Sequence, residues 1–454
     1  MSQQLTIKKF GPIKELQLDI QDLLIFIGSQ ASGKSTVSKA IFFFKSLRDD
    51  LTSYLYKCYN EKRFEDSVSN FAKRAKQKFL KMYGSVIQFP DMELKYNYGN
   101  GMEVVIKSSA NNQFTDIIFD EIFRQKFRDL IEQSRDFNTE LQQASLKFSF
   151  SSSREISAIK AKEATLFANI TNEVNQLFND DRDLLFLPAG RSLITILSQQ
   201  RYNIDMGDDI TSSNTDLAAD SLIKLDYLMQ NFINRIDSAK PIFNQAIDDL
   251  IKEKISTSSD TEFQEVIDIA QRIVDSILKG SYRYQNGTEK IDFGNGYSTL
   301  INFASSGQQE VVWILLLILL LIINERKVFL VIEEPEAHLF PTAQKEMIDL
   351  IALLANQAEN QIILTTHSPY ILSSFNNLLY AHQLGLDKPE KVAPVVNRHL
   401  WINSDKLNAF MVDKGTAYSI MDSEMKLIRS AEIDKASDII VNIFNQLFDL
   451  EDAG

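Results

Sequence analysis

Eight residues near the start of the chain have types and spacing suited to binding phosphate. Residues 28–35 read Gly-Ser-Gln-Ala-Ser-Gly-Lys-Ser and fit the pattern G-x-x-x-x-G-K-[ST]. In such a loop, backbone N–H groups surround the phosphates of a nucleotide. We expect Lys34 to reach the β- and γ-phosphates of ATP and the Ser35 hydroxyl to ligate Mg²⁺. The expected nucleotide-binding residues are Gly28, Ser29, Gln30, Ala31, Ser32, Gly33, Lys34, Ser35 and Thr36.

The residues around this loop predict the strand and the helix that such a site requires. Residues 24–27 are an uninterrupted apolar run, typical of a parallel strand covered on both faces. After the loop, Val37, Ala40, Ile41 and Phe44 recur at helical spacing and would place one apolar stripe against a sheet. A strand, a loop and a helix in this order direct the positive end of the helix at the phosphates.

A pair of carboxylates follows another apolar run much later in the chain. Residues 328–332 predict a central strand, and Glu333 and Glu334 come directly after it. Ligands of open α/β sheets lie at the C-terminal ends of the strands. We expect Glu333 to hold Mg²⁺, directly or through water, and Glu334 to orient and deprotonate the attacking water. A solvated acidic turn would have the same letters, but the phosphate loop favours the chemical interpretation.

Two further segments supply polar groups of the same kind. Four residues ahead of an apolar segment predict a helix start, where free N–H groups attract anions. These four are Ser305, Ser306, Gly307 and Gln308, and on their own they would also fit an ordinary turn. Residues 361–366 predict one more buried strand, and His367 follows it. An imidazole at that edge could donate a hydrogen bond to a γ-phosphate oxygen.

Taken in chain order, these segments resemble the ABC-type ATPases. Residues 305–308 resemble the ABC signature, with Ser306 where the usual consensus has glycine. Glu333 and Glu334 resemble the Walker B motif, with Glu333 in place of the commoner aspartate. Residues 336–339 then fall at the D-loop and His367 at the switch histidine. The resemblance implies that the signature of one chain faces the γ-phosphate bound by an opposing chain.

The sequences of these motifs are similar to those of the OLD and RecF-like branch of these ATPases. That branch includes the stand-alone ATPase subunits of bacterial anti-phage systems of the Septu or PARIS kind. Residues 333–339, 366–369, 9–13 and 186–191 carry this resemblance, which covers residues 1–108, 181–200 and 280–400. It implies an ATPase with ATP and Mg²⁺ as cofactors, working as a homodimer or a higher homo-oligomer. OLD nucleases carry a TOPRIM nuclease domain at the C-terminal end, and the residues after His367 are too few for one, so a separate effector, expected to be a nuclease, is implied.

Composition limits the compartment and the partners. The 454 residues can bury a large core and form more than one domain. A single cysteine, Cys58, and a start without the layout of a secretion signal indicate a cytoplasmic protein. The net charge of −13 argues against a strongly basic face on the protein. Nucleic acid stays among the partners considered, but not as one held by such a face. The apolar run at 311–323 is shorter than the roughly 20 residues of a membrane span, so no membrane is expected.

The predicted fold class is α/β: an ABC-type P-loop ATPase core with a mostly helical insertion and a short C-terminal α+β extension. We assign residues 1–108 and 280–400 to the two parts of the core, 109–279 to the insertion and 401–454 to the extension, with 181–200 returning to the core. Hairpins are predicted at 92–106 and 282–293, and strands at 5–7, 16–20, 400–402 and 409–412. A helical pattern is predicted from Ile428 to Leu447. Gln88 is one of several glutamines that could serve as a Q-loop residue.

Three functions fit these features. The first is the ATPase engine of a multi-protein defence assembly whose destructive activity lies on a separate partner. The second is a RecF-like repair ATPase that clamps DNA directly, which the acidic balance disfavours. The third is a scaffold in which ATP fixes a dimer and turnover is negligible; the carboxylate of Glu334 beside Glu333 argues against it. A transporter ATPase has no obvious place for the helical insertion.

Overall fold

The computed structural model describes residues 2–108, 115–147, 153–192, 225–244, 247–257, 260–357, 359–429 and 441–446. The chain divides into two compact units. The first unit comprises Met1–Ile20, Ala31–Leu184 and Lys414–Thr416. The second comprises Gln21–Gln30, Leu185–Asp413 and Ala417–Gly454. The predicted α/β fold class is confirmed, whereas the domain boundaries given above remain predictions.

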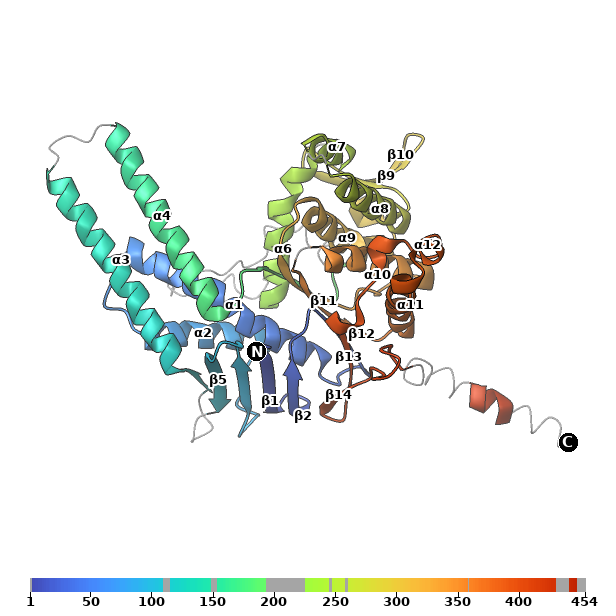
Figure 1. Cartoon of the computed structure of the whole chain (residues 1–454), viewed down its shortest axis with the longest axis horizontal. Coiled ribbons are helices and arrows are strands. Elements are labelled where there is room, and N and C mark those ends of the chain that lie inside the picture. Colours follow the sequence, from blue (N-terminus) through green and yellow to red (C-terminus); the bar gives the residue numbers. More distant parts are fainter. Residues whose placement is uncertain are drawn as a thin grey trace, which may run out of the picture. The chain divides into compact units, whose positions relative to one another are not determined.

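The second unit is built on a six-stranded sheet in the order β14-β13-β3-β12-β11-β7 (Figure 1). Its strands are β3 (Leu23–Ile27), β7 (Asp183–Leu187), β11 (Val328–Glu333), β12 (Gln361–Thr366), β13 (Leu407–Asp413) and β14 (Thr416–Ser419). The four central strands β13, β3, β12 and β11 run parallel. Every residue of β3, β11 and β12 is buried, which explains why β3 is entirely apolar and why β11 and β12 have polar residues only at their ends. The three strands predicted at 24–27, 328–332 and 361–366 are therefore confirmed.

Helices of the second unit pack around this sheet and around one another. They are α6 (Tyr227–Ala239), α7 (Ile247–Thr257), α8 (Thr261–Leu278), α9 (Ser306–Ile323), α10 (Pro341–Asn356), α11 (Pro369–Asp387) and α12 (Pro389–Val392). Helix α9 contacts α8 and α10, and its residues from Glu310 to Ile323 are all buried. By length and composition α9 could cross a membrane, but 78% of it is buried inside the protein, as in a core helix.

A small antiparallel sheet of the second unit leads into α9. It contains β8 (Ser281–Gln285), β9 (Thr288–Gly294) and β10 (Tyr297–Leu300) in the order β10-β9-β8. Gln285 pairs with Thr288 across a two-residue turn at Asn286 and Gly287, so the hairpin predicted at 282–293 is confirmed. The short 3₁₀ helix η4 (Ile301–Phe303) then joins β10 to the start of α9.

The first unit contains an antiparallel sheet in the order β2-β1-β4-β5-β6. Its strands are β1 (Gln4–Phe10), β2 (Ile13–Asp19), β4 (Glu93–Asn97), β5 (Glu103–Ser108) and β6 (Thr115–Phe119). Its helices are α1 (Lys34–Asn60), α2 (Val68–Tyr83), α3 (Glu121–Lys147) and α4 (Ser153–Phe178), of which the last two lie side by side as an antiparallel pair (Figure 1). The strands predicted at 5–7 and 16–20 and the hairpin at 92–106 are confirmed.

The insertion predicted as mostly helical also contains β6, which pairs with β5 and completes the sheet of the first unit. Two expectations about the C-terminal part of the chain were wrong in detail. The strand predicted at 400–402 is absent, and the 3₁₀ helix η5 (Arg398–Leu400) lies there because the Asn397 side chain caps the His399 N–H. Ile428 bridges to Met421 instead of starting a helix. Of the predicted C-terminal helix, residues 441–446 are helical, and Ile433, Ile439 and Leu447 lie outside the described residues.

Candidate nucleotide site

The predicted phosphate loop joins a strand to a helix, as its sequence requires. Strand β3 ends at Ile27 and α1 begins at Lys34. Gly28, Ser29 and Gln30 belong to the second unit, and the loop residues from Ala31 onward belong to the first. Ala31 has a left-handed backbone with φ 60°. The loop therefore leaves the carboxyl end of β3 and enters the first turn of α1 at the N-terminus of that helix, the end of a helix that attracts anions.

Gly33 caps α1 and tolerates no side chain. Its φ is 112°, and a Cβ atom there would lie 2.6 Å from Cδ1 of Ile13 and 3.0 Å from Cγ of Pro12. Both the conformation and the space therefore require glycine. Pro12 and Ile13 come from the segment 9–13 that the sequence singled out, so that segment packs directly against the start of α1. Lys34 is 5% exposed and Ser35 is exposed at the first turn of the helix.

Glu333 and Glu334 occupy the carboxyl end of β11. Glu333 is 6% exposed; its Oε2 accepts a hydrogen bond of 3.4 Å from the Ala189 N–H. Its other oxygen, Oε1, is buried and has no hydrogen-bond partner among the described residues. Glu334 leaves the strand with a left-handed φ of 47°, and its N–H donates to the Thr365 carbonyl of β12 at 2.9 Å. The side chain of Glu334 is thereby turned out of the sheet and is 39% exposed.

The structure brings Glu334 and His367 together. His367 follows β12, and its Nε2 lies 3.1 Å from Oε1 of Glu334. Glu336 holds the histidine in place: its Oε1 accepts hydrogen bonds of 2.7 Å from the Thr366 hydroxyl and from the His367 N–H. Since β3, β11 and β12 run parallel, Gly28, Glu333, Glu334 and His367 all lie at the same edge of the sheet. A carboxylate and an imidazole in contact can share a proton, which suits general acid–base chemistry.

A fully buried arginine supports this edge, and its role was missed from the sequence. Arg191 was noted only as the end of segment 186–191, yet it is 2% exposed and lies beside Glu310 of α9. Its guanidinium donates to the carbonyls of Glu333 at 2.7 Å and Glu334 at 3.0 Å. Burial lowers the pKa of Arg191, and the carboxylates of Glu310 and Glu333 oppose that shift. No spacing rule links residues so far apart, so only the unusual arginine after a buried strand could have hinted at this contact.

The segment resembling the ABC signature forms the N-terminal end of α9. Ser305 is the N-cap residue: its hydroxyl accepts from the Gln308 N–H, and Gln308 Oε1 accepts from the Ser305 N–H. This is a capping box, a pattern that the sequence Ser-x-x-Gln signals. Gly307 packs against the turn after Glu336, where a Cβ atom would lie 2.8 Å from the His338 carbonyl oxygen. Ser305 and Ser306 are exposed, so the free N–H end of the helix is open to solvent.

The donor set fits Mg²⁺. Among the described residues, no three His, Cys, Asp or Glu side chains group closely enough to hold a metal ion by themselves. The carboxylate oxygen Oε1 of Glu333, buried without a donor, is the kind of ligand that Mg²⁺ takes in small number beside substrate phosphates. Glu333 is therefore suited to hold an ion whose other ligands come from a nucleotide and water.

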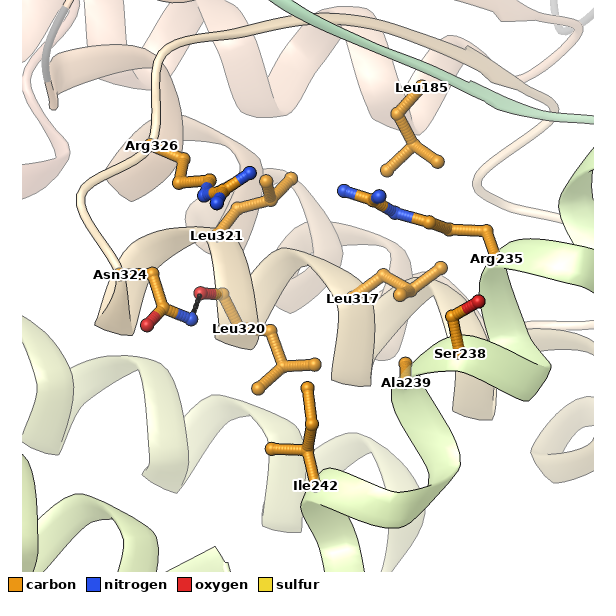
Figure 2. A pocket seen from close by; sticks show the side chains of 10 residues that line it. All are labelled: Leu185, Arg235, Ser238, Ala239, Ile242, Leu317, Leu320, Leu321, Asn324 and Arg326. Carbon is orange, nitrogen blue, oxygen red and sulfur yellow. Dashed lines mark hydrogen bonds between the residues drawn. The ribbon is translucent and has the colours of Figure 1, made fainter. Parts of the chain in front are cut away.

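One pocket of the second unit lies away from this edge (Figure 2). It has a volume of about 340 Å³ and is lined by residues of α6, of the C-terminal half of α9 and of the turn before β11. Arg235 and Arg326 extend toward each other from opposite sides above Leu317 and Leu321. Because Arg326 precedes β11 and Glu333 ends it, this pocket is distinct from the candidate nucleotide site.

Residues 1–372 match the model of the family AAA_15, described as AAA ATPase domain. A comparison with curated proteins gave no match. Among solved structures, the chain is similar to an SmcHead bound to the C-winged helix domain of ScpA, with a TM-score of 0.42 and 11% identity, over 93% of this chain and 97% of that chain. The SMC head domain from Thermotoga maritima gives 0.36 and 11%, over 92% and 98%.

A third structure, the Smc head domain with an extended coiled coil bound to the C-terminal domain of ScpA, derived from Pyrococcus furiosus, gives a TM-score of 0.37 and 13% identity, over 97% of this chain and 98% of that chain. These likenesses are distant.

Proposed function

The chain belongs to the AAA_15 family of AAA ATPase domains, and we propose that it is an ATP-hydrolysing subunit of a bacterial anti-phage defence complex. In this proposal it works in the cytoplasm as a head-to-tail dimer or higher homo-oligomer that controls a separate effector, a nuclease. The observation that carries the hydrolysis step is the 3.1 Å contact between Glu334 and His367 at the edge where the phosphate loop leaves β3. The defence role rests on the motif resemblance described above.

Each predicted side chain has a task that its position supports. The N–H groups from Gly28 to Thr36 bind the phosphates, and Lys34 contacts the β- and γ-phosphates. Glu333 and Ser35 hold Mg²⁺, which neutralises charge on the phosphate oxygens when it is bound. Glu334 takes the proton of the attacking water as general base. The one N–H of a neutral His367 orients that carboxylate until a nucleotide binds, and then donates to a γ-phosphate oxygen instead. Catalysis of this kind depends on positioning the water more than on covalent chemistry.

The proposed dimer follows from the exposed start of α9. Ser305, Ser306, Gly307 and Gln308 offer N–H groups and a hydroxyl, but Ser305 and Gln308 are engaged in their own capping box. The free groups at Ser306 and Gly307 are therefore the ones we assign to the γ-phosphate of the opposing chain. The effector would bind one ATPase state more tightly than the other, so that nucleotide occupancy shifts its activity.

Two variants test the hydrolysis proposal. Lys34→Ala should lose ATP binding because it removes the cation expected at the β- and γ-phosphates. Glu334→Gln should keep ATP binding and lose turnover by about a hundredfold or more, since it removes the general base and keeps the shape. Binding is measured by equilibrium dialysis and turnover by phosphate release. A Glu334→Gln protein that hydrolyses ATP within a few-fold of the parent rate would move the base elsewhere.

A mixing experiment tests the shared site. Lys34→Ala chains and Ser305→Arg chains should each be inactive alone, and their mixture should regain up to one working site per dimer. A monomer with full ATPase activity would refute the shared site. An effector is sought by affinity capture with the Glu334→Gln variant, with and without ATP. Direct, ATP-dependent binding of DNA by the purified chain would instead favour the RecF-like alternative.

A further inference from the structure

Arg191 makes an unusual set of contacts for a single buried side chain. Its guanidinium donates to three main-chain carbonyls besides that of Glu334: Pro188 at 2.5 Å, Glu333 at 2.7 Å and Glu310 at 3.2 Å. The bond to the Glu334 carbonyl is 3.0 Å long. Two of these four bonds therefore hold the carbonyls of the proposed metal ligand and the proposed base. Only the planar, five-donor fork of arginine can reach several acceptors in this way.

Glu310 completes the cluster from the side of α9. Its carboxylate is 1% exposed and forms an ion pair of 3.3 Å with Arg191. The same carboxylate accepts from the N–H groups of Arg191 at 3.0 Å and Ser192 at 2.7 Å. Glu310 lies one turn after the exposed start of α9, in the same rigid helix. The loop after β7, the start of α9 and the end of β11 are therefore joined through one buried ion pair.

The backbone that Arg191 holds is one that a glutamate rarely adopts. Glu334 has a φ of 47°, and this conformation turns its side chain out of β11 toward His367. Glu334 is also held by its own N–H bond to Thr365. Removing the guanidinium would release its carbonyl and that of Glu333 while leaving the side chains themselves unchanged.

We propose that Arg191 is the positioning residue for Glu334, and that Glu310 links it to α9, so that a nucleotide bound at the start of α9 alters the geometry of the base. This inference rests on the proposed ATPase function and adds a route from the signature to the base. In the shared site, an opposing γ-phosphate that pulls on the N-terminal end of α9 moves Glu310. Arg191 then carries that movement to the carbonyls of Glu333 and Glu334.

The test compares kcat and KM with stability in matched variants. Arg191→Lys keeps the charge and loses the fork, and Glu310→Gln keeps the shape and loses the charge. The double variant Arg191→Met/Glu310→Met replaces the pair by apolar groups, an exchange that buried ion pairs often tolerate. The control is Lys240→Met/Glu289→Met, because that pair in the same unit is also buried, with side chains 8% and 9% exposed, and is 2.7 Å long. Each protein is assayed for melting temperature, ATP affinity and steady-state hydrolysis.

We expect Arg191→Lys and Glu310→Gln to lower kcat at least about tenfold while KM and ATP affinity change less than about threefold, since only the base is displaced. The apolar double variant should melt near the parent temperature but keep the lowered kcat of the single variants. The control double variant should keep the parent kcat. A folded Arg191→Lys protein with kcat within threefold of the parent overturns the inference, as does a double variant that recovers both. A parent chain without ATP turnover would refute the proposed function itself, a result distinct from these.

Discussion

Gly307 gives the sharpest steric test of the signature end. Replacing it by alanine puts a Cβ atom 2.8 Å from the His338 carbonyl oxygen, a backbone atom that cannot rotate away. Ordinary contacts begin near 3.4 Å, so the start of α9 and the turn after Glu336 must separate by about 0.6 Å. A misplacement of about 1 Å in an active site can cost about a hundredfold in rate, so we expect kcat to fall about tenfold.

Stability should change little in this variant. Alanine favours a helix over glycine by up to about 1 kcal/mol, which offsets part of the strained contact. ATP affinity should be unchanged because the phosphate loop is not touched. Gly307→Ser places the same Cβ atom and should lose the same activity, so the two variants control for each other. Phosphate release and thermal unfolding supply the measurements. A Gly307→Ala protein with kcat within twofold of the parent would refute the steric argument.

Gly385→Ala should lower the free energy of unfolding by about 1–3 kcal/mol, because its Cβ atom would overlap the Trp401 ring; urea titration checks this, and parent-like stability would contradict the packing. Burial lowers the pKa of Lys45 from 10.5 to about 8 despite the neighbouring Asp180. Because the pKa of Lys45 is lower in the folded state than in the unfolded state, the unfolded chain binds more protons between these two pKa values. The free energy of unfolding is therefore highest above the unfolded-state pKa and falls as the pH is lowered toward the folded-state pKa. The stability of the parent relative to Lys45→Met should therefore rise between pH 8 and 10.5, by at most about 3 kcal/mol, and a flat difference would show an ordinary lysine. Burial also raises the pKa of the Cys58 thiol to about 11, so thiol reagents at pH 8 should label it only after unfolding, and fast labelling of the folded protein would contradict its burial.

The features predicted correctly from the sequence are those whose cause is local. Strands β3, β11 and β12 are buried on both faces, so each has an apolar run at its centre. The hairpin turn at Asn286 and Gly287 follows from turn chemistry alone. The contact between Glu334 and His367 follows from placing two parallel strand ends at one edge.

The features that were missed depend on distant partners. Strand β6 is short and polar at Asp116, and only its pairing with β5 makes it a strand. The contact between Arg191 and Glu310 spans 119 positions, for which no periodicity exists. The segment 400–402 has the composition of a strand, but local capping by Asn397 decides its conformation. The sequence Ser-x-x-Gln at Ser305 and Gln308 also signals the capping box that the structure shows, so these two residues complete the start of α9 in addition to the anion-binding role expected of this segment.

The parallel sheet also has a consequence for how the protein is made. Strand β3 lies between β12 and β13, and more than 300 residues separate it from either of them in the chain. A ribosome adding about 5–20 residues per second therefore leaves β3 without its neighbours for tens of seconds. During that interval the apolar helix α9 leaves the ribosome before α10, which packs against it, has emerged. The nascent chain should then be a client of chaperones that hold apolar segments, and overexpression without them should yield aggregates.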